Sequence, residues 1–180
     1  MREIALHILD LLENSIRAEA SVIELTVDIQ TAEDRLRIAV QDNGRGLTIT
    51  PEEALNPFRT TKAGKKTGLG LSLFKAAAEQ AGGSLELSQP AGGGVRVDVE
   101  MGLTHVDRTP LGDLAGTLSG MIWTNPGIDF RVRVRIDGRE KYVSVRDLAA
   151  QSGDGEPDGL AIARQAAAIL AEELRNVPLA

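Results

Sequence analysis

One short stretch constrains the fold of this chain more than any other. Residues 36–41 alternate apolar and polar side chains, which predicts a strand, and Asp42 follows directly, with Gly44 and Gly46 after it. Spaced glycines let a backbone approach a ligand where a Cβ would clash. The carboxylate can accept a hydrogen bond from an exocyclic amine such as that of adenine. The alternative is a hairpin turn, which Asp-Asn-Gly favours when the stretch is taken alone.

The overall composition limits the classes of protein to which the chain can belong. Its 180 residues allow one domain with a substantial core and an appendage. The absence of cysteine excludes disulfides and thiolate metal sites and fits a cytoplasmic location. A net charge of −6 argues against general nucleic-acid binding, and no apolar run is long enough for a membrane span. We therefore expect neither nucleic acid nor a membrane as partner.

The first predicted helix carries a polar line. Residues 3–18 contain no Gly or Pro, and Asp10, Asn14 and Arg17 are spaced to share one helix face. Asn14 offers a hard oxygen to Mg²⁺, and Asp10 can accept a proton from water. The alternative is an ordinary solvated face, which is favoured unless later motifs support a site. His7, one turn earlier, is expected to be a half-buried structural residue rather than a phosphoacceptor.

A glycine-rich turn precedes a second helix. Residues 67–72, Thr-Gly-Leu-Gly-Leu-Ser, run into a helix expected over residues 73–81, which Gly82 ends. Free N–H groups and the helix dipole make such a start an anion site, and nearby lysines add charge: Lys62, Lys65 and Lys66. A flexible linker is the alternative. The segment lacks the Gly-Lys-Ser/Thr of a Walker A loop and does not close a strand as a dinucleotide-binding turn does.

The remaining segments of the first half predict three more strands and a short helix. Residues 21–29 alternate and should pair with residues 36–41 as an antiparallel hairpin. Residues 84–88 and 95–101 also alternate and are joined by a glycine-rich loop. Thr50 followed by Pro51 predicts a short capped helix.

Four motifs, taken together, carry a resemblance to a known family. They are Asp10 with residues 13–18 (Glu-Asn-Ser-Ile-Arg-Ala), residues 42–46, residues 56–62 (Asn-Pro-Phe-Arg-Thr-Thr-Lys) and residues 67–71. Their order and spacing over residues 1–103 resemble the ATP-binding domain shared by gyrase, heat-shock chaperones, histidine kinases and mismatch-repair proteins, the GHKL or Bergerat fold. The resemblance implies an α/β (α+β) fold, a two-layer sandwich of a mixed sheet with helices on one face.

The resemblance also implies ATP and Mg²⁺ as cofactors and gives roles by position. Asn14 would coordinate Mg²⁺, and Asp42 would bind the adenine amino group. Gly44 and Gly46 would make room for the base. The other implied nucleotide contacts are Arg17, a basic phosphate contact; Phe58, Thr61 and Lys62, which precede the ATP lid; and Thr67, Gly68, Leu69 and Gly70, which hold phosphate.

Asp10 departs from the family pattern. Members that hydrolyse ATP usually have Glu there, and histidine kinases often have Asn; Asp is acidic but one methylene shorter. Asp10 is therefore the candidate catalytic base, and the reaction stays open. The motifs at residues 56–62 and 67–71 look most like those of two-component kinases. Because the motifs start near Met1, we expect no dimerisation domain before them, and only His7 and His105 as phosphoacceptors in cis.

Residues 104–180 are expected to form a small α/β docking or dimerisation module. A helix is predicted over residues 110–123, in which glycines at four-residue spacing (Gly112, Gly116 and Gly120) permit close packing. Asp137-Gly138 predicts a hairpin between residues 128–136 and 140–145. A last helix over residues 159–175 has an apolar stripe of Leu160, Ala163, Ala167, Leu170 and Leu174.

Residues 104–180 also contain a row of arginines and a histidine beside charged residues. Arg131, Arg133 and Arg135 make one strand face basic, which suits an acidic partner or, more ordinarily, a solvated face paired by acids. His105 beside Asp107 and Arg108 is expected to lie in an ion-paired turn. The segment is similar to the tail of short stand-alone ATP-binding proteins associated with iron hydrogenases in anaerobes.

Three functions follow from these expectations. The first is a Mg²⁺-ATP-binding regulatory protein that phosphorylates or conformationally controls a partner protein, such as a response regulator or an iron-hydrogenase subunit. The second is a slow ATPase with Asp10 as base, which uses nucleotide to switch homodimerisation. The third is a non-enzymatic docking module in which the nucleotide is structural.

Overall fold

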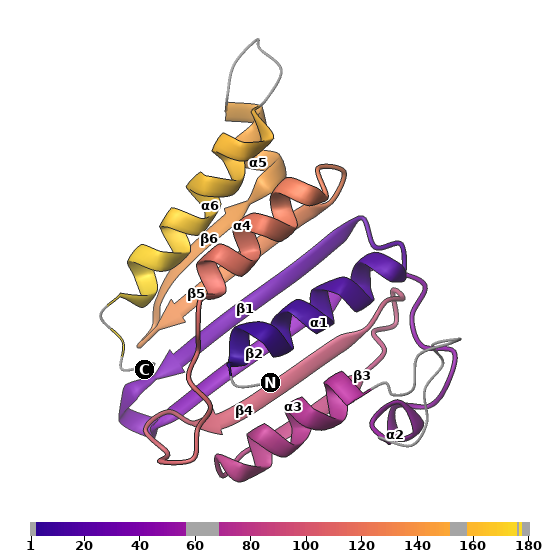
Figure 1. The fold of residues 1–180 in the computed structure, drawn as a ribbon, viewed down its shortest axis with the longest axis vertical. Coiled ribbons are helices and arrows are strands. Elements are labelled where there is room, and N and C mark those ends of the chain that lie inside the picture. The colour runs from indigo at the N-terminus through magenta and orange to yellow at the C-terminus, as the bar shows by residue number, and fades with distance from the viewer. Residues whose placement is uncertain (1–2, 57–68, 152–157, 176, 178–180) are drawn as a thin grey trace.

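The computed structural model describes residues 3–56, 69–151, 158–175 and 177. They form a mixed sheet of six strands in the order β3-β4-β2-β1-β5-β6 (Figure 1). The strands are β1 (Val22–Gln30), β2 (Arg35–Asp42), β3 (Ser84–Ser88), β4 (Arg96–Gly102), β5 (Asp129–Ile136) and β6 (Arg139–Ser144). The helices are α1 (Ile4–Arg17), the 3-10 turn η1 (Thr31–Glu33), α2 (Pro51–Ala54), α3 (Leu69–Gln80), α4 (Leu114–Thr124), α5 (Val145–Gln151) and α6 (Gly159–Leu174).

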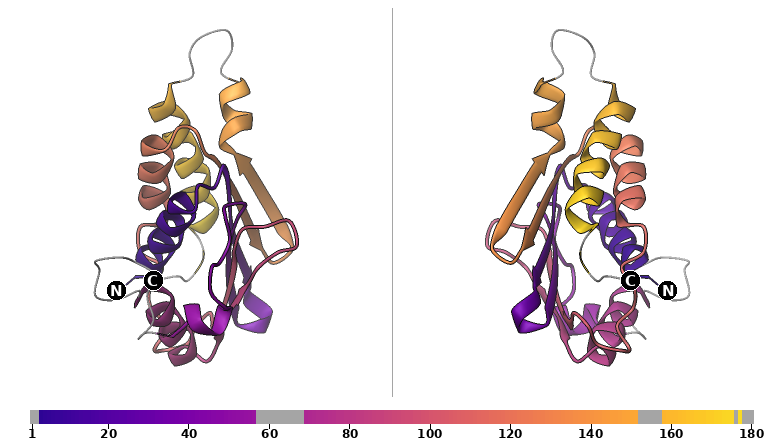
Figure 2. Two further views of the ribbon diagram at one scale, coloured as in Figure 1. Left: turned by 90° about the vertical axis from the view of Figure 1, so that its right-hand side faces the viewer. Right: turned by 90° about the vertical axis from the view of Figure 1, so that its left-hand side faces the viewer.

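The helices α1, α3, α4 and α6 lie together on one side of the sheet, as the edge-on views show (Figure 2). The side chains that β1 and β2 turn toward these helices alternate with side chains on the open face, so burial follows the period of two along each strand. The predicted fold class, a two-layer α/β sandwich with helices on one face, is confirmed.

Most elements of the first half match their predicted bounds. β1 and β2 pair antiparallel, from Gln30 opposite Arg35 to Ile23 opposite Asp42. Thr50 caps α2 through a reciprocal capping box with Glu53. The predicted start of the second helix was too late, because α3 is already helical at Leu69, within the segment assigned to the turn.

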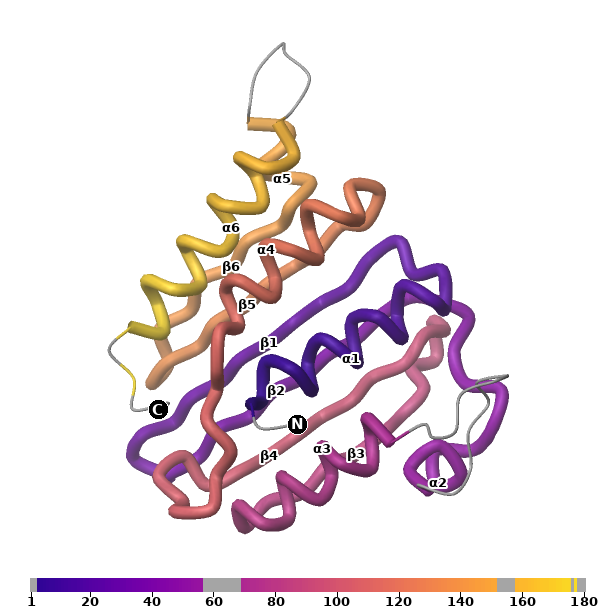
Figure 3. Tube along the Cα trace, viewed as in Figure 1, coloured from indigo at the N-terminus to yellow at the C-terminus, as the bar shows by residue number. Residues whose placement is uncertain are grey.

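The second half joins the same sheet. β5 runs parallel to β1, from Val22 opposite Asp129 to Ile29 opposite Ile136, although about a hundred residues separate them in the chain (Figure 3). The predicted hairpin then turns through Asp137 and Gly138, with φ of 49° and 83°, and adds β6 at the edge. Residues 104–180 thus extend the sheet of the first half.

Hydrogen bonds between turns also connect the two halves. The carboxylate of Asp137 accepts bonds from the backbone N–H and the hydroxyl of Thr31, each at 2.8 Å. The N–H of Thr104 donates to the Asp34 carboxylate at 2.8 Å. The β1–β2 turn is therefore tied to the β5–β6 hairpin and to the start of the second half.

Three predictions for the second half need correction. α4 begins at Leu114, not at residue 110, because the Asp113 carboxylate caps it by accepting a bond from Gly116 N–H at 2.8 Å. The glycine stripe permits close packing only in part: a Cβ on Gly112 would lie 2.3 Å from the Glu3 carboxylate at the start of α1, whereas among the described residues a Cβ on Gly120 would meet nothing within 4 Å. The predicted stripe of α6 is correct only in part: Ala163 and Leu170 are buried and Leu174 packs against the core, but Leu160 is exposed, and Ile162 and Ala166 complete the buried face.

The arginines of β5 are paired with acids. Arg131 lies 2.7 Å from Asp129 and 3.2 Å from Glu24, and Arg135 lies 2.6 Å from Glu140. Arg133 contacts the same Glu140 at 3.7 Å. This favours a solvated, acid-paired sheet face over a site for an acidic partner.

The core is one cluster of apolar side chains that includes residues of both halves, from Ile4 on α1 to Leu170 on α6. Leu, Ile, Val and Ala dominate it, and among the phenylalanines, tyrosine and tryptophan in the described part of the chain only Phe74 and Phe130 are fully buried. None of the helices in the described ranges is both long and apolar enough to cross a membrane.

His7 is a buried structural residue, as the sequence suggested. It is 2% exposed, and its ring stacks on Phe74 with the centroids 4.6 Å apart, so it joins α1 to α3. Within the described part of the chain, neither ring nitrogen has a hydrogen-bond partner. Burial, only partly opposed by the charge of Asp10, lowers the pKa of His7 to about 4.

We expect the free energy of unfolding to fall as the pH drops from 6.5 to about 4, because there the unfolded chain binds a proton that the native His7 does not. The loss from this residue should reach up to about 3 kcal/mol and then level off. Urea unfolding across this pH range measures it. His7→Leu should flatten the curve, and His105→Gln, at an exposed position, should not. An unchanged pH dependence in His7→Leu would contradict the assignment.

Candidate functional site

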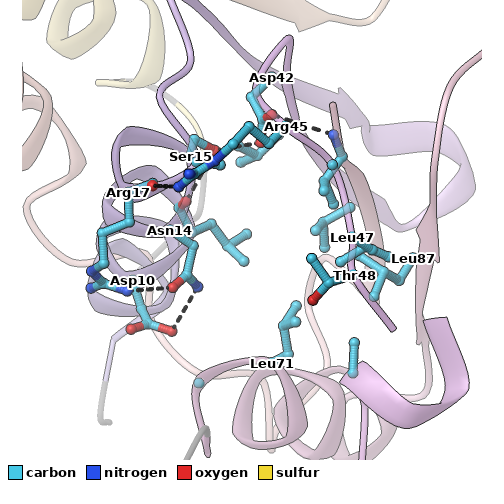
Figure 4. A pocket seen from close by; sticks show the side chains of 18 of the residues that line it. Asp10, Asn14, Ser15, Arg17, Asp42, Arg45, Leu47, Thr48, Leu71 and Leu87 are labelled. Atoms are coloured by element: carbon cyan, nitrogen blue, oxygen red, sulfur yellow. Dashed lines mark hydrogen bonds between the residues drawn. The ribbon is translucent and has the colours of Figure 1, made fainter. Parts of the chain in front are cut away.

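A cavity of about 530 Å³ opens between α1, the start of α3 and the sheet (Figure 4). One wall is apolar and the other is a polar line along α1. The apolar lining comprises Leu11, Ala18, Val40, Leu47, Ile49, Ala54, Leu71, Leu87, Val95 and Val97. The polar lining comprises Asp10, Asn14, Ser15, Arg17, Asp42, Arg45 and Thr48, and Gly46 and Gly70 complete it.

Asp42 is the fixed polar group at the sheet end of the cavity. It is the last residue of β2 and only 7% exposed. The Ser15 hydroxyl donates to its Oδ2 at 2.7 Å, and the N–H groups of Gly44 and Val95 donate to its Oδ1 at 2.8 and 3.3 Å. With both oxygens held, the carboxylate is a preoriented acceptor beside an apolar wall.

The glycines around Asp42 are needed for packing within the protein itself. A Cβ at Gly44 would lie 2.7 Å from the carbonyl oxygen of Ala18, so this loop rests on the end of α1. Gly46 has a φ of 79°, and a Cβ on Gly94 would lie 1.8 Å from the carbonyl oxygen of Asp42. These close approaches hold the Asp42 backbone between α1 and the β3–β4 loop.

The polar line on α1 forms a chain of side-chain bonds. Asn14 Nδ2 donates to Asp10 Oδ2 at 3.4 Å, and Arg17 Nη1 donates to Asn14 Oδ1 at 2.6 Å (Figure 4). Arg17 also pairs with Glu13 at 2.6 Å. From the glycine loop, Arg45 donates to the carbonyl oxygen of Arg17 at 2.8 Å. The predicted face of Asp10, Asn14 and Arg17 therefore faces the cavity as one connected group.

The start of α3 lies against Asp10. A Cβ built on Gly70 would come 1.7 Å from Asp10 Oδ2, so only glycine lets the first described turn of α3 approach so closely. The carboxylate therefore sits next to a helix start, where backbone N–H groups and the helix dipole favour negative charge. An anion bound there would share the space with Asp10.

We expect Gly70→Ala to lower the free energy of unfolding by about 1–3 kcal/mol, because the new methyl group overlaps Asp10. Gly120→Ala is the matched control: it lies in a helix with open space around it and should be stabilising by up to about 1 kcal/mol. Asp10→Ala should remove most of the cost of Gly70→Ala in a double-mutant cycle. Equal stability of Gly70→Ala and Gly120→Ala would show that the close approach does not exist.

The structure brings together six of the eight predicted site residues that it describes. Asp10, Asn14, Arg17, Asp42, Gly46 and Gly70 all line the cavity. Gly44 packs behind Asp42, and Leu69 opens α3 beside Gly70. Phe58, Thr61, Lys62, Thr67 and Gly68, together with Lys65 and Lys66, lie outside the described residues.

Sequence reasoning missed several contributors. No role in the site was predicted for Ser15, yet its hydroxyl donates to Asp42. Arg45, between the two glycines, was given no role. The apolar wall from Val40, Leu87, Val95 and Val97 is built from strand positions whose alternation was visible, but nothing local indicated that they face a cavity.

The donor set for a metal is small. In residues 3–56, 69–151 and 158–175, no group of three or more His, Cys, Asp or Glu side chains gathers as a metal site. The cavity does offer two oxygen donors suited to Mg²⁺, the amide oxygen of Asn14 and the carboxylate of Asp10. Because Mg²⁺ is usually held by few protein oxygens together with substrate phosphates, these residues fit a cation that arrives with a nucleotide.

Comparison with known proteins covers the part of the chain that builds the cavity. Residues 2–105 match the model of the histidine kinase-, DNA gyrase B- and HSP90-like ATPases. The sensor histidine kinase ZraS of Escherichia coli O157:H7 is 30% identical over 106 residues, which are 58% of this chain and 23% of that protein. The chain thus matches less than a quarter of this relative's length. All residues that line the cavity lie within the matched range.

Proposed function

Because the chain belongs to the family of histidine kinase-, DNA gyrase B- and HSP90-like ATPases, which bind ATP, we propose that it takes up Mg²⁺-ATP in the cavity between α1 and α3. The observation that carries the proposal is the buried Asp42 carboxylate, held by Ser15 and two N–H groups at the end of an apolar wall. Such an acceptor suits the exocyclic amine of adenine, and the wall suits its ring faces.

The opposite end of the cavity suits the phosphates. Arg17 brings positive charge along α1, and the start of α3 adds N–H groups and a favourable dipole. Asn14 would hold Mg²⁺, which supplies charge neutralisation to the phosphates when bound. Adenine at Asp42 and phosphates along α1 toward Gly70 give the nucleotide one direction in the site.

We infer that the chain is a regulatory protein that uses bound ATP to phosphorylate or conformationally control a partner protein. Two facts support this: the relative is a sensor histidine kinase, and the motifs at residues 56–62 and 67–71 resemble those of two-component kinases. The extended sheet adds α4, α5 and α6 beside the ATP-binding part, which offers surface for a partner or a second copy.

A slow ATPase is the second candidate, and the position of Asp10 favours it. Its carboxylate lies beside Asn14 and at the start of α3, where the terminal phosphate is expected. Asp10 would accept a proton from water as the water oxygen bonds to the γ-phosphorus and the bond to the ADP oxygen breaks. In this case ATP turnover would switch the protein's own dimerisation.

The fate of the γ-phosphoryl group in a single turnover tests the proposal. The protein in excess over γ-labelled ATP should bind the label, and release of labelled phosphate measures hydrolysis. If Asp10 is the base, Asp10→Asn should slow release by about 100-fold or more. Label that stays as ATP, with Asp10→Asn unchanged, would favour control by binding alone. Failure of the folded protein to bind ATP would reject the proposed function.

A further inference from the structure

The amide of Asn14 is held at both ends by its neighbours on α1. Its Nδ2 donates to Asp10 Oδ2, and its Oδ1 accepts from Arg17 Nη1 at 2.6 Å. Only one orientation of the amide satisfies both neighbours, because a carboxylate can only accept and a guanidinium can only donate. The amide oxygen, the donor that Mg²⁺ would use, is therefore the atom that Arg17 occupies.

The position of Arg17 allows its contact with Asn14 to break. Its second nitrogen pairs with Glu13 at 2.6 Å, but the side chains of Arg17 and Glu13 remain 47% and 50% exposed. Exposed ion pairs of this i, i+4 kind are weak and are readily exchanged with water. Because Arg17 also lines the cavity, a guanidinium released from Asn14 can stay within reach of anionic groups there.

A guanidinium and a divalent cation cannot share this oxygen without strong repulsion. Two positive centres bound to one neutral oxygen would lie a few ångströms apart at the rim of a partly apolar cavity. An amide oxygen offers no negative charge to offset that repulsion. This repulsion disfavours simultaneous occupation of Asn14 Oδ1 by Arg17 and by Mg²⁺.

We propose that in the ligand-free protein Arg17 occupies the position on Asn14 Oδ1 that Mg²⁺ takes when Mg²⁺-ATP binds. Mg²⁺ then displaces Arg17 from the amide oxygen, and Arg17 moves to the phosphates. The inference rests on the proposed function. In the ligand-free protein, the Glu13–Arg17 pair keeps the Asn14 amide in the orientation that Mg²⁺ needs. Because Arg17 is bound to Asn14 Oδ1, Mg²⁺ must compete with Arg17 for this oxygen. Arg17 is thus a positioning residue before ATP binds and a phosphate contact afterwards.

The test measures ATP affinity by titration calorimetry twice for each protein, in excess Mg²⁺ and in EDTA. The ratio of the two affinities reports how strongly the metal and the nucleotide help each other. Arg17→Lys keeps the positive charge for the phosphates but loses the planar fork that bridges Asn14 and Glu13. Its affinity in EDTA should stay near that of the wild type, and the Mg²⁺ ratio should rise about threefold or more.

Arg17→Met separates the two roles further. Without the charge, affinity in EDTA should fall, while the Mg²⁺ ratio should rise as in Arg17→Lys because the competitor is gone. Arg37→Lys is the matched control: Arg37 pairs with Glu100 at 3.1 Å on the open face of the sheet, away from the cavity. It should leave both affinities unchanged.

An unchanged or lower Mg²⁺ ratio in both Arg17 variants would overturn the inference even though ATP still binds. A ratio that rises in Arg37→Lys as well would also overturn it, because the effect would then follow from replacing any arginine and not from freeing Asn14 Oδ1. Absence of ATP binding by the folded wild type would instead reject the proposed function itself, so the two failures are distinguishable.

Discussion

Asp42→Ala is expected to weaken ATP binding by about 10- to 100-fold. The adenine amine loses its charged hydrogen-bond acceptor, and the protein groups that donate to the Asp42 carboxylate lose their partner. Ser15 and the N–H groups of Gly44 and Val95 all donate to this carboxylate. Titration calorimetry in excess Mg²⁺ measures the loss. The effect should exceed that of any other single substitution in the apolar half of the cavity.

The same bonds mean that Asp42→Ala also removes support from the fold, so a second variant is needed. Asp42→Asn keeps an oxygen for the N–H groups of Gly44 and Val95, and its amide nitrogen can donate to the Ser15 hydroxyl. It should fold normally but present an N–H to the adenine amine, which repels it. Asp98→Asn, a β4 carboxylate paired with Arg96 at 2.6 Å, is the control and should bind ATP as the wild type does.

A folded Asp42→Asn protein with wild-type affinity for ATP would show that the base does not lie at Asp42. The cavity would then have to take the nucleotide in the opposite direction, or the proposed function would fail. Thermal unfolding of each variant, measured alongside, distinguishes lost binding from lost structure.

The parts of the site that the sequence revealed are those set by local geometry. Asp10, Asn14 and Arg17 share a face because a helix repeats every 3.6 residues, and Asp42 ends a strand whose alternation is plain. Once the helix and the strand are known, four polar positions of the cavity follow. Their roles toward ATP and Mg²⁺ stay predictions.

The parts that it did not reveal depend on tertiary contacts. The bond between Ser15 and Asp42 joins residues 27 positions apart and exists only because the end of α1 packs on the end of β2. The buried face of α6 was predicted only in part, because alanines occur all around this helix and periodicity selects no single face. The pairing of β5 with β1 is a parallel crossover, which a strand pattern alone cannot indicate.

The pairing of β5 with β1 bears on the predicted domain boundary between residues 103 and 104, which stays a prediction. β1 holds β2 on one side and β5 on the other, and its inward residues share one core with Phe130, Val132 and Val134. If β1 loses β5, its edge and its apolar side chains are exposed to water. We therefore expect the ATP-binding part and the second half to unfold together.

Phe130→Ala in the full chain tests this directly. Phe130 is 1% exposed, and truncating a buried Phe costs about 3–5 kcal/mol, a large part of the roughly 5–15 kcal/mol that stabilises a small domain. The unfolding midpoint should fall by about 6–20 °C. ATP binding should be lost at the same temperature as the helical circular dichroism signal.

Tyr142→Ala is the matched control, because this aromatic residue also lies in the second half but is 42% exposed on β6. It should change the free energy of unfolding by less than about 1 kcal/mol. Two separate transitions in Phe130→Ala, with ATP still bound after the first, would mean that residues 1–103 fold independently and that the second half is an attached module. A single transition would mean that any event on α4, α5 or α6, including the docking of a partner, acts on the same cooperative unit that holds Asp42 and the end of α1 in place.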